Sequence, residues 1–226
     1  KEKSMHISNK DAYRVKGWLK AIPFFLSAFL LLTSCSEDDG TTDEYADWQS
    51  RNETFFAERY ATAKANSDGT WRTYLNWTLD GQQPYPSGKG SITYQSTDYI
   101  AVQVLKSGTG TESPLITDSV RVHYRGRLIP TTSHSEGYVF DQSYKGTLDT
   151  KTALPKGFYA NQVIDGWTTA LLHMHIGDTW RIYVPAALGY GSVTKTGIPA
   201  YSTLVFDITL NSFYRKTASS SKKTKK

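Results

Sequence analysis

The chain has 226 residues, enough for one domain of ordinary size and a smaller extension. Its 26 Lys and Arg and 21 Asp and Glu give a formal charge of +5, but the basic residues gather at the two ends. Residues 35–214 carry 14 basic and 19 acidic groups, and this acidic balance argues against a nucleic-acid-binding protein. The single cysteine, Cys35, excludes an internal disulfide.

Residues 1–34 have the pattern of an export signal. Four basic residues between positions 10 and 20 precede an apolar run at 21–32. This run is too short for a membrane-spanning helix, which needs ~20 residues, and a basic region before a short apolar segment is typical of a secretory signal. At the other end, residues 215–226 are rich in Lys, Ser and Thr, a composition that predicts a disordered basic tail.

The sequence around Cys35 predicts a lipid anchor. Leu32-Thr33-Ser34-Cys35 resembles the site that lipoprotein signal peptidases cleave, after which the cysteine is acylated. Several acyl chains give firm membrane attachment, because each buried methylene contributes about 0.8 kcal/mol. Residues 35–43 then form a flexible linker, and its acidic part resembles the signal that carries some Gram-negative lipoproteins to the cell surface. We expect a lipid-anchored protein of the cell envelope, in the outer membrane and facing the periplasm or the exterior; a buried cysteine in an apolar helix is the alternative.

Residues 44–94 form an accessory segment that begins with a helix. Between positions 44 and 65, large side chains recur every three or four residues and share one face. This face consists of Trp48, Asn52, Phe55, Phe56, Tyr60 and Ala63. The Asn66-Ser67-Asp68-Gly69 segment predicts the end of the helix. The helix either packs on the chain's own domain or mediates contact with a partner, such as a homodimer.

Residues 95–214 have mainly the period of β-strands. Apolar and polar residues alternate at 119–128, 180–185 and 203–210, and shorter runs predict strands at 91–95 and 99–105. One short helical stretch lies among them. Its apolar face consists of Trp167, Ala170, Leu171 and Met174, and Gly177 marks its end. The predicted fold is therefore α+β, with an antiparallel sheet around one short helix and a helical extension before it.

Five motifs within residues 95–213 come in the order found in FKBP-type domains, and the segment resembles that family. The motifs are Val122-His123-Tyr124-Arg125-Gly126, Val139-Phe140-Asp141-Gln142-Ser143, Val163-Ile164-Asp165-Gly166-Trp167, Tyr190-Gly191, and the run from Ile198 through Phe206 to Asp207. The resemblance implies a curved antiparallel sheet wrapped on a short helix, and peptidyl-prolyl cis/trans isomerase (rotamase) activity. It also implies proline-containing polypeptides as substrates, macrolide-type inhibitors as ligands, and no cofactor or metal.

This chemistry requires a suitable pocket but no nucleophile. Amide resonance opposes rotation by ~18–20 kcal/mol, so exchange at an Xaa-Pro bond takes tens to hundreds of seconds. The twisted amide has less charge separation than the planar amide, and an apolar pocket therefore favours the twisted state. By resemblance, the catalytic residues are Tyr124, Asp141, Trp167, Tyr190 and Phe206. By the same resemblance, the substrate-binding residues are Phe140, Phe158, Val163, Ile164 and Ile198.

The resemblance also implies individual roles. Trp167 forms the floor beneath the prolyl ring, and Asp141 accepts a hydrogen bond from the Tyr124 hydroxyl. The Tyr190 hydroxyl and the Ile164 backbone N–H donate hydrogen bonds to substrate carbonyls. Many relatives carry a second aromatic residue shortly before the Val163-Ile164 pair; here Phe158 is near, but Lys156 and Gly157 occupy the neighbouring positions. An arginine often found five residues after the pocket aspartate is replaced by Gly146. These departures bear on substrate preference and efficiency.

Two other interpretations compete with catalysis. A prolyl-peptide-binding or holdase module would use the same pocket with little or no turnover. A structural lipoprotein would keep the fold but fill the pocket with its own side chains. A metal site at His173 and His175 is not indicated, because side chains two positions apart on a helix point in different directions.

Overall fold

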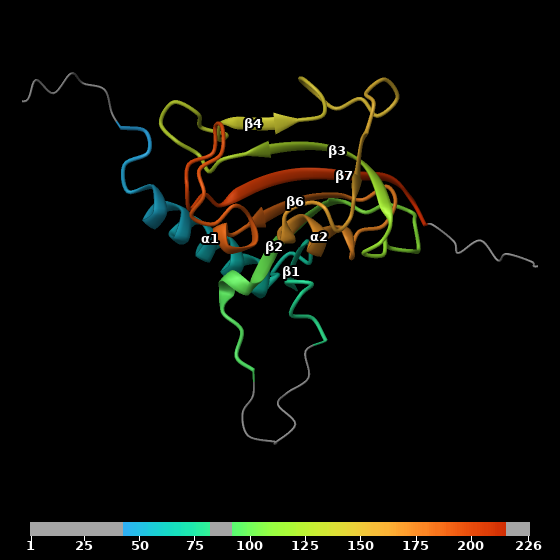
Figure 1. Cartoon of the computed structure of the whole chain (residues 1–226), viewed down its shortest axis with the longest axis horizontal. Coiled ribbons are helices and arrows are strands. Elements are labelled where there is room, and N and C mark those ends of the chain that lie inside the picture. The colour runs from blue at the N-terminus through green and yellow to red at the C-terminus, as the bar shows by residue number, and fades with distance from the viewer. Residues whose placement is uncertain (1–42, 82–91, 216–226) are drawn as a thin grey trace, which may run out of the picture. The chain divides into compact units, whose positions relative to one another are not determined.

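The computed structural model describes residues 43–81 and 92–215. The predicted export signal, the cysteine at position 35 and almost all of the basic tail lie outside these residues. The described strands form one antiparallel sheet in the order β1-β2-β6-β7-β3-β4, and β5 also pairs with β3 (Figure 1). The strands are β1 (Trp71–Leu75), β2 (Tyr99–Lys106), β3 (Ser119–Arg127), β4 (Val139–Gln142), β5 (Lys156–Tyr159), β6 (Thr179–Val184) and β7 (Leu204–Tyr214).

A short helix, α2 (Asp165–Leu171), covers the inner face of the curved sheet. Side chains alternate across each strand, and one set from β2, β3, β6 and β7 packs with α2 in a single hydrophobic core. This core includes Ile100, Val102, Val122, Ile182, Leu204, Ile208, Trp167, Leu171 and Met174. The predicted α+β fold, with an antiparallel sheet around a short helix, is confirmed.

The N-terminal helix, α1 (Trp48–Ala65), packs against the outer face of the sheet. Ala101, Tyr183 and Val205 point outward from their strands and form a second buried cluster with Phe56 and other residues of α1 and β1. The face that the sequence predicts to be apolar is therefore covered by this chain's own sheet, which is one of the two expected alternatives. Homodimerisation through this helix stays a prediction.

The C-terminal end of α1 follows from the local sequence. The helix ends at Ala65, and the next residue, Asn66, has a left-handed backbone with φ 43°, a conformation that asparagine tolerates better than most residues. The Asn66 Oδ1 atom then accepts the backbone N–H of Trp71 at 2.9 Å. Asn66 thus ends the helix through its backbone and holds the first residue of β1 through its side chain, where the sequence predicts a stop signal.

Polar contacts tie α1 to the segment that precedes β7. Asn52 is buried, and its Oδ1 accepts the backbone N–H of Thr203 at 2.7 Å while its Nδ2 donates to the Trp48 carbonyl at 2.7 Å. The Trp48 indole N–H donates to the Ser202 hydroxyl at 2.9 Å, and that hydroxyl donates to the Pro199 carbonyl at 2.6 Å. The accessory helix therefore helps to hold the turn between residues 199 and 203.

Some details differ from the sequence-based expectations. The strand predicted at 91–95 is wrong, because the described residues 92–95 are irregular and lead into a 3-10 helix, η1 (Ser96–Asp98). The Asp98 carboxylate accepts the backbone N–H of Gln95 at 2.7 Å, a cap that favours this turn over a strand. Helix α1 begins at Trp48, four residues later than predicted, and α2 ends at Leu171, before Gly177. No helix within residues 43–81 and 92–215 is both long and apolar enough to cross a membrane.

Candidate active site

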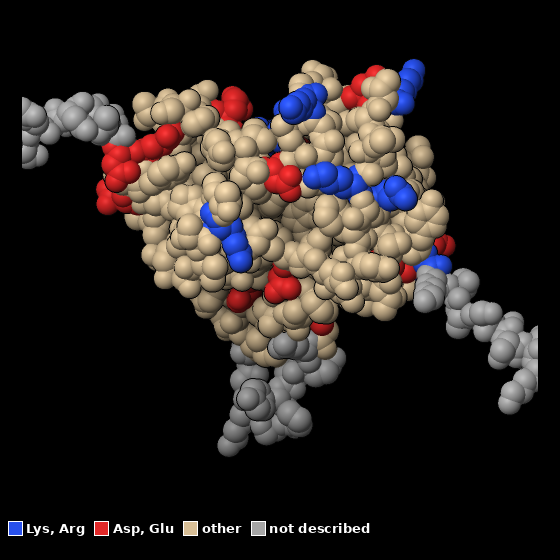
Figure 2. Space-filling view, turned by 45° about the horizontal axis from the view of Figure 1, so that its top comes forward, with Lys and Arg blue, Asp and Glu red and all other residues tan. Residues whose placement is uncertain are grey.

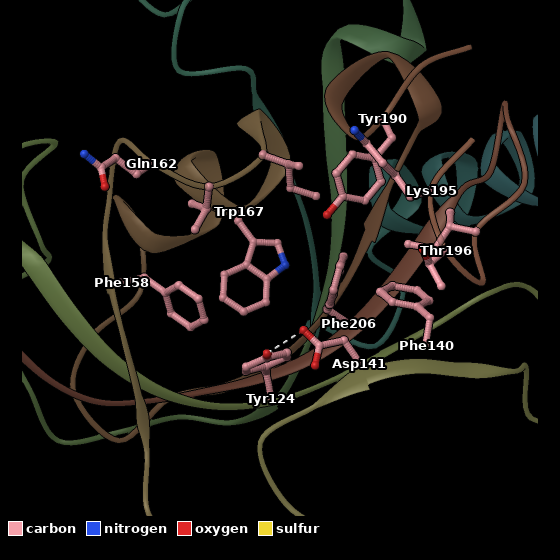
Figure 3. Close-up of a pocket in the computed structure, with 13 residues that line it drawn as sticks. Tyr124, Phe140, Asp141, Phe158, Gln162, Trp167, Tyr190, Lys195, Thr196 and Phe206 are labelled. Atoms are coloured by element: carbon pink, nitrogen blue, oxygen red, sulfur yellow. Dashed lines mark hydrogen bonds between the residues drawn. The ribbon is translucent and has the colours of Figure 1, made fainter. Parts of the chain in front are cut away.

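A cavity of about 740 Å³ opens between α2, the β3–β4 edge of the sheet and the loop that follows residue 190. All ten residues predicted to act in catalysis or substrate binding line this one cavity, together with Gln162, Lys195 and Thr196 (Figure 3). The roles of the ten stay predictions. The open cavity that they line contradicts the alternative of a pocket filled by the chain's own side chains.

The floor and walls of the cavity are aromatic rings that meet edge to face. The Trp167 indole, which is only 4% exposed, lies 5.1 Å from the ring of Tyr124, 5.2 Å from Phe206 and 5.6 Å from Phe158, at interplanar angles of 73–87°. Phe140 meets Phe206 in the same way at 5.5 Å. Edge-to-face contacts of this kind are the favoured geometry for aromatic pairs, so the rings support one another around an open apolar surface.

Two glycines make this close packing feasible. A Cβ at Gly126 would lie 2.6 Å from a ring carbon of Phe206 and 2.7 Å from one of Phe140, so any larger residue on β3 would displace both rings. A Cβ at Gly166 would lie 2.4 Å from a methyl of Val184, so glycine lets the start of α2 sit directly on β6. That contact places the next residue, Trp167, at the base of the cavity.

The polar part of the cavity is one connected group on its wall. The Tyr124 hydroxyl donates to Asp141 Oδ2 at 2.6 Å, the hydrogen bond drawn in Figure 3. The Lys156 ammonium donates to the Tyr124 oxygen at 3.2 Å and lies 3.6 Å from Asp141 Oδ1. Burial, and then the hydrogen bond to Asp141, raise the pKa of Tyr124, so its hydroxyl stays protonated at neutral pH.

Two hydrogen-bond donors face the cavity without internal partners. Within the described part of the chain, neither the Tyr190 hydroxyl nor the Ile164 backbone N–H forms a hydrogen bond. Burial, and then the nearby Asp141 charge, raise the pKa of Tyr190, which keeps its hydroxyl a donor. The backbone of Ile164 is extended immediately before α2, so its N–H lies outside the hydrogen bonds of the helix. The Tyr190 hydroxyl and the Ile164 N–H are therefore both available to carbonyls of a bound peptide.

Sequence reasoning missed four residues at this site: Lys156, Gln162, Lys195 and Thr196. Lys156 appears in the sequence only as a departure from the family pattern, although it contacts both Tyr124 and Asp141. Lys195 and Thr196 lie in a tight turn closed by reciprocal 2.9 Å hydrogen bonds between the backbones of Lys195 and Ile198. Gly197 in this turn has a φ of 74°, and the glycine was the one available turn signal.

The two histidines at positions 173 and 175 have separate surroundings. The His173 ring lies 4.2 Å from the ring of Tyr74 and its Nδ1 is 2.8 Å from the Thr169 carbonyl oxygen. His175 instead approaches Asp178 at 3.7 Å. Among residues 43–81 and 92–215, no group of three or more His, Cys, Asp or Glu is placed to hold a metal ion.

Comparisons with known proteins agree with this geometry. A family model described as FKBP-type peptidyl-prolyl cis-trans isomerase matches residues 110–211. The chain is 40% identical over 115 residues to Peptidyl-prolyl cis-trans isomerase Mip of Coxiella burnetii, covering 50% of this chain and 44% of that protein. It is 39% identical over 109 residues to Outer membrane protein MIP of Legionella longbeachae, covering 48% of this chain and 41% of that protein. The chain thus spans less than half the length of these two relatives.

A solved structure covers more of the chain. The crystal structure of a peptidyl-prolyl cis-trans isomerase from Pseudomonas syringae pv. tomato aligns with a TM-score of 0.50 and 26% identity, over 78% of this chain and 100% of that one. The five sequence motifs, the curved sheet around α2 and these matches lead to the same assignment. The C-terminal half of this chain therefore contains a domain of the FKBP-type peptidyl-prolyl cis-trans isomerase family, matched at residues 110–211.

Proposed function

We propose that this protein is a peptidyl-prolyl cis/trans isomerase that assists the folding of exported proteins in the cell envelope. The observation that carries the proposal is the convergence of Trp167, Tyr124, Phe206 and Phe158 on one open cavity, with the hydrogen-bonded Tyr124–Asp141 pair in its wall. Such a cavity fits a prolyl ring and excludes water from the amide that precedes it.

The mechanism follows from the polarity of the amide. A planar amide is stabilised by charge separation that water solvates well, and this stabilisation is lost as the bond twists. In an apolar cavity the planar form loses solvation while the twisted form loses less, so the barrier falls. Each 1.36 kcal/mol of this difference gives a tenfold increase in rate.

The polar groups then position the peptide. The Tyr190 hydroxyl and the Ile164 N–H donate to carbonyls on either side of the bond, and they hold the backbone while the amide rotates. The Tyr124–Asp141–Lys156 group fixes the ring of Tyr124 against Trp167. No bond is made or broken, and no proton leaves any of these residues.

An envelope location is supported by the N-terminal sequence and by one relative. The basic and apolar pattern of residues 1–34 and the Leu-Thr-Ser-Cys motif support export and lipid attachment at Cys35. The relative from Legionella longbeachae is named as an outer membrane protein. Metabolic labelling with a palmitate analogue in a Gram-negative host tests this part, since Cys35→Ser should abolish the label.

The activity itself is tested by magnetisation-exchange NMR on a short Xaa-Pro peptide. We expect the pure, folded protein to accelerate cis/trans exchange above the uncatalysed rate, and a macrolide ligand of the family to inhibit that acceleration. Chemical-shift titration of the same peptide separates the alternative: saturable binding without faster exchange would identify a prolyl-peptide-binding or holdase module.

A further inference from the structure

The charges around the cavity are not balanced. Three charged side chains lie at or beside the cavity in the described part of the chain. Asp141 and Lys195 line the cavity, and Lys156 reaches Asp141 from β5. Figure 2 shows basic side chains on opposite sides of the hollowed face and acidic ones near its rim. One carboxylate is thus set against two ammonium groups.

The carboxylate already has two partners. Asp141 accepts the short hydrogen bond from Tyr124 and pairs with Lys156 at 3.6 Å. Both partners lie on the same wall of the cavity, and the Lys156 ammonium also lies 5.3 Å from the centre of the Tyr124 ring. Asp141 and Lys156 are therefore already partners of each other in this wall.

Lys195 is in a different situation. Its ammonium lies 5.7 Å from the centre of the Tyr190 ring, and no carboxylate within residues 43–81 and 92–215 pairs with it. It is exposed at the mouth of the cavity, beside the ring of Tyr190 (Figure 3). This cation is available to whatever enters the cavity.

The backbone beneath Lys195 is held firmly. Its N–H and carbonyl both bond to Ile198, a buried residue of the cavity lining. The surrounding loop is closed by the Tyr201 N–H donating to the Gly191 carbonyl at 2.8 Å, and helix α1 supports the next turn through Ser202 and Thr203. These hydrogen bonds hold the Lys195 backbone at the cavity lining, so its side chain carries the charge near the cavity mouth.

We propose that Lys195 gives this cavity a preference for prolyl segments in which an acidic residue lies next to the proline. This inference rests on the proposed function and names its substrate class. A Glu or Asp beside the proline brings a carboxylate to the mouth of the cavity, within reach of the unpaired ammonium. Exposed ion pairs contribute modestly, so we expect a two- to fivefold preference that salt weakens.

The test compares peptides that differ only in charge. One pair is acetyl-Ala-Glu-Pro-Phe-amide and its Gln counterpart, and the second places Glu or Gln after the proline. For each, NMR gives kcat/KM for exchange above the uncatalysed rate, and chemical-shift titration gives the affinity. The enzymes are the wild type, Lys195→Gln, Lys195→Glu and the control Lys106→Gln, whose lysine lies at the exposed end of β2 and outside this cavity.

We expect the wild type and Lys106→Gln to favour the Glu peptide about threefold in at least one pair. The ratio should fall to about one in Lys195→Gln and below one in Lys195→Glu. Equal values for Glu and Gln in both pairs, or a preference that survives in Lys195→Gln, would overturn the inference while leaving isomerase activity in place. If no peptide exchanges faster, the proposed function fails, and the affinity ratios alone decide the charge preference.

Discussion

The hydroxyl of Tyr124 lies 2.6 Å from Oδ2 of Asp141, and this contact joins β3 to β4 at the wall of the cavity. The tyrosine ring meets Trp167 edge to face on one side, and the Lys156 ammonium approaches its hydroxyl on the other. A single hydrogen bond thus connects the apolar floor to the polar rim. Its removal tests whether the polar group matters for turnover.

Replacement of Asp141 by Ala should lower kcat/KM for Xaa-Pro exchange about tenfold. The variant leaves the buried Tyr124 hydroxyl without its acceptor and Lys156 without its partner. Hydrogen bonds to charged groups contribute about 1.5–3 kcal/mol, and the lower value applies because the Asp141 side chain is 54% exposed. Glu136→Ala, on an exposed residue outside the cavity, is the control and should match the wild type. Equal rates for Asp141→Ala and wild type would show that the pair has no part in catalysis.

Replacement of Tyr190 by Phe should lower kcat/KM about two- to tenfold while the protein stays folded. A neutral hydrogen bond contributes roughly 0.5–1.5 kcal/mol, and the Tyr190 hydroxyl is unpartnered in the described chain and faces the cavity. Because burial raises the pKa of Tyr124 and of Tyr190, both hydroxyls stay protonated well into alkaline solution. The wild-type profile should therefore be flat between pH 7 and 9; a loss of activity near pH 8 that disappears in Tyr190→Phe would contradict this account.

Replacement of Asn52 by Ala should lower the free energy of unfolding by about 2–4 kcal/mol. The variant leaves two buried backbone groups, the Thr203 N–H and the Trp48 carbonyl, without the partners they have now, and each such loss costs roughly 1–3 kcal/mol. Urea denaturation measures the change. The control is Glu53→Ala on the exposed face of the same helix, which should stay within about 0.5 kcal/mol of wild type. Similar stability for both variants would show that α1 does not support the 199–203 turn.

His123 should make the fold less stable in mild acid. The residue is 1% exposed, and neither ring nitrogen has a hydrogen-bond partner in the described part of the chain. Burial lowers the pKa of His123 below its ordinary value of about 6.5, so the native state holds it neutral. The contribution of neutral His123 to the free energy of unfolding is intact above pH 6.5. It is lost as pH falls from 6.5 toward the lowered pKa, because His123 takes up a proton in the unfolded chain at a higher pH than in the native state.

The variant His123→Leu isolates this effect. Urea denaturation at pH 7.5 and 5.5 should show a smaller loss of stability in the variant than in the wild type. Leucine fills similar space without a titratable group, so the comparison removes contributions from the other histidines. An identical pH dependence in the two proteins would show that His123 is charged, or freely charges, in the native state.

The sequence allowed the site to be predicted better than the strand boundaries. Alternation along β3 and β7 places Tyr124 and Phe206 on the inner face, and the family resemblance supplied the other eight residues that line the cavity. The periodicity of the sequence did not predict strands β4 and β5, which have four residues each and pair with β3. Segments this short carry little periodic signal, and their pairing partner decides their conformation.

The contacts of Lys156 and Lys195 could not be predicted from the sequence, because they arise only in the tertiary structure. A lysine in a loop or edge strand is usually solvated, and no local pattern shows that one ammonium meets Asp141 while the other stays unpaired. The same holds for Asn52, whose place in the helical face was predictable but whose bond to Thr203, 151 positions away, was not. Such contacts arise when distant segments are brought together by the sheet.

The most direct test of the apolar-cavity account changes polarity without changing shape. Val163 lines the cavity, whereas Val193 is 52% exposed and lies outside its lining. In the NMR exchange assay, the wild type and Val193→Thr should accelerate Xaa-Pro exchange equally, while Val163→Thr, which adds one hydroxyl, should lose about three- to tenfold in kcat/KM. Equal rates for the two threonine variants, or no acceleration by the folded wild type, would contradict the claim that a dry aromatic cavity drives the rotation.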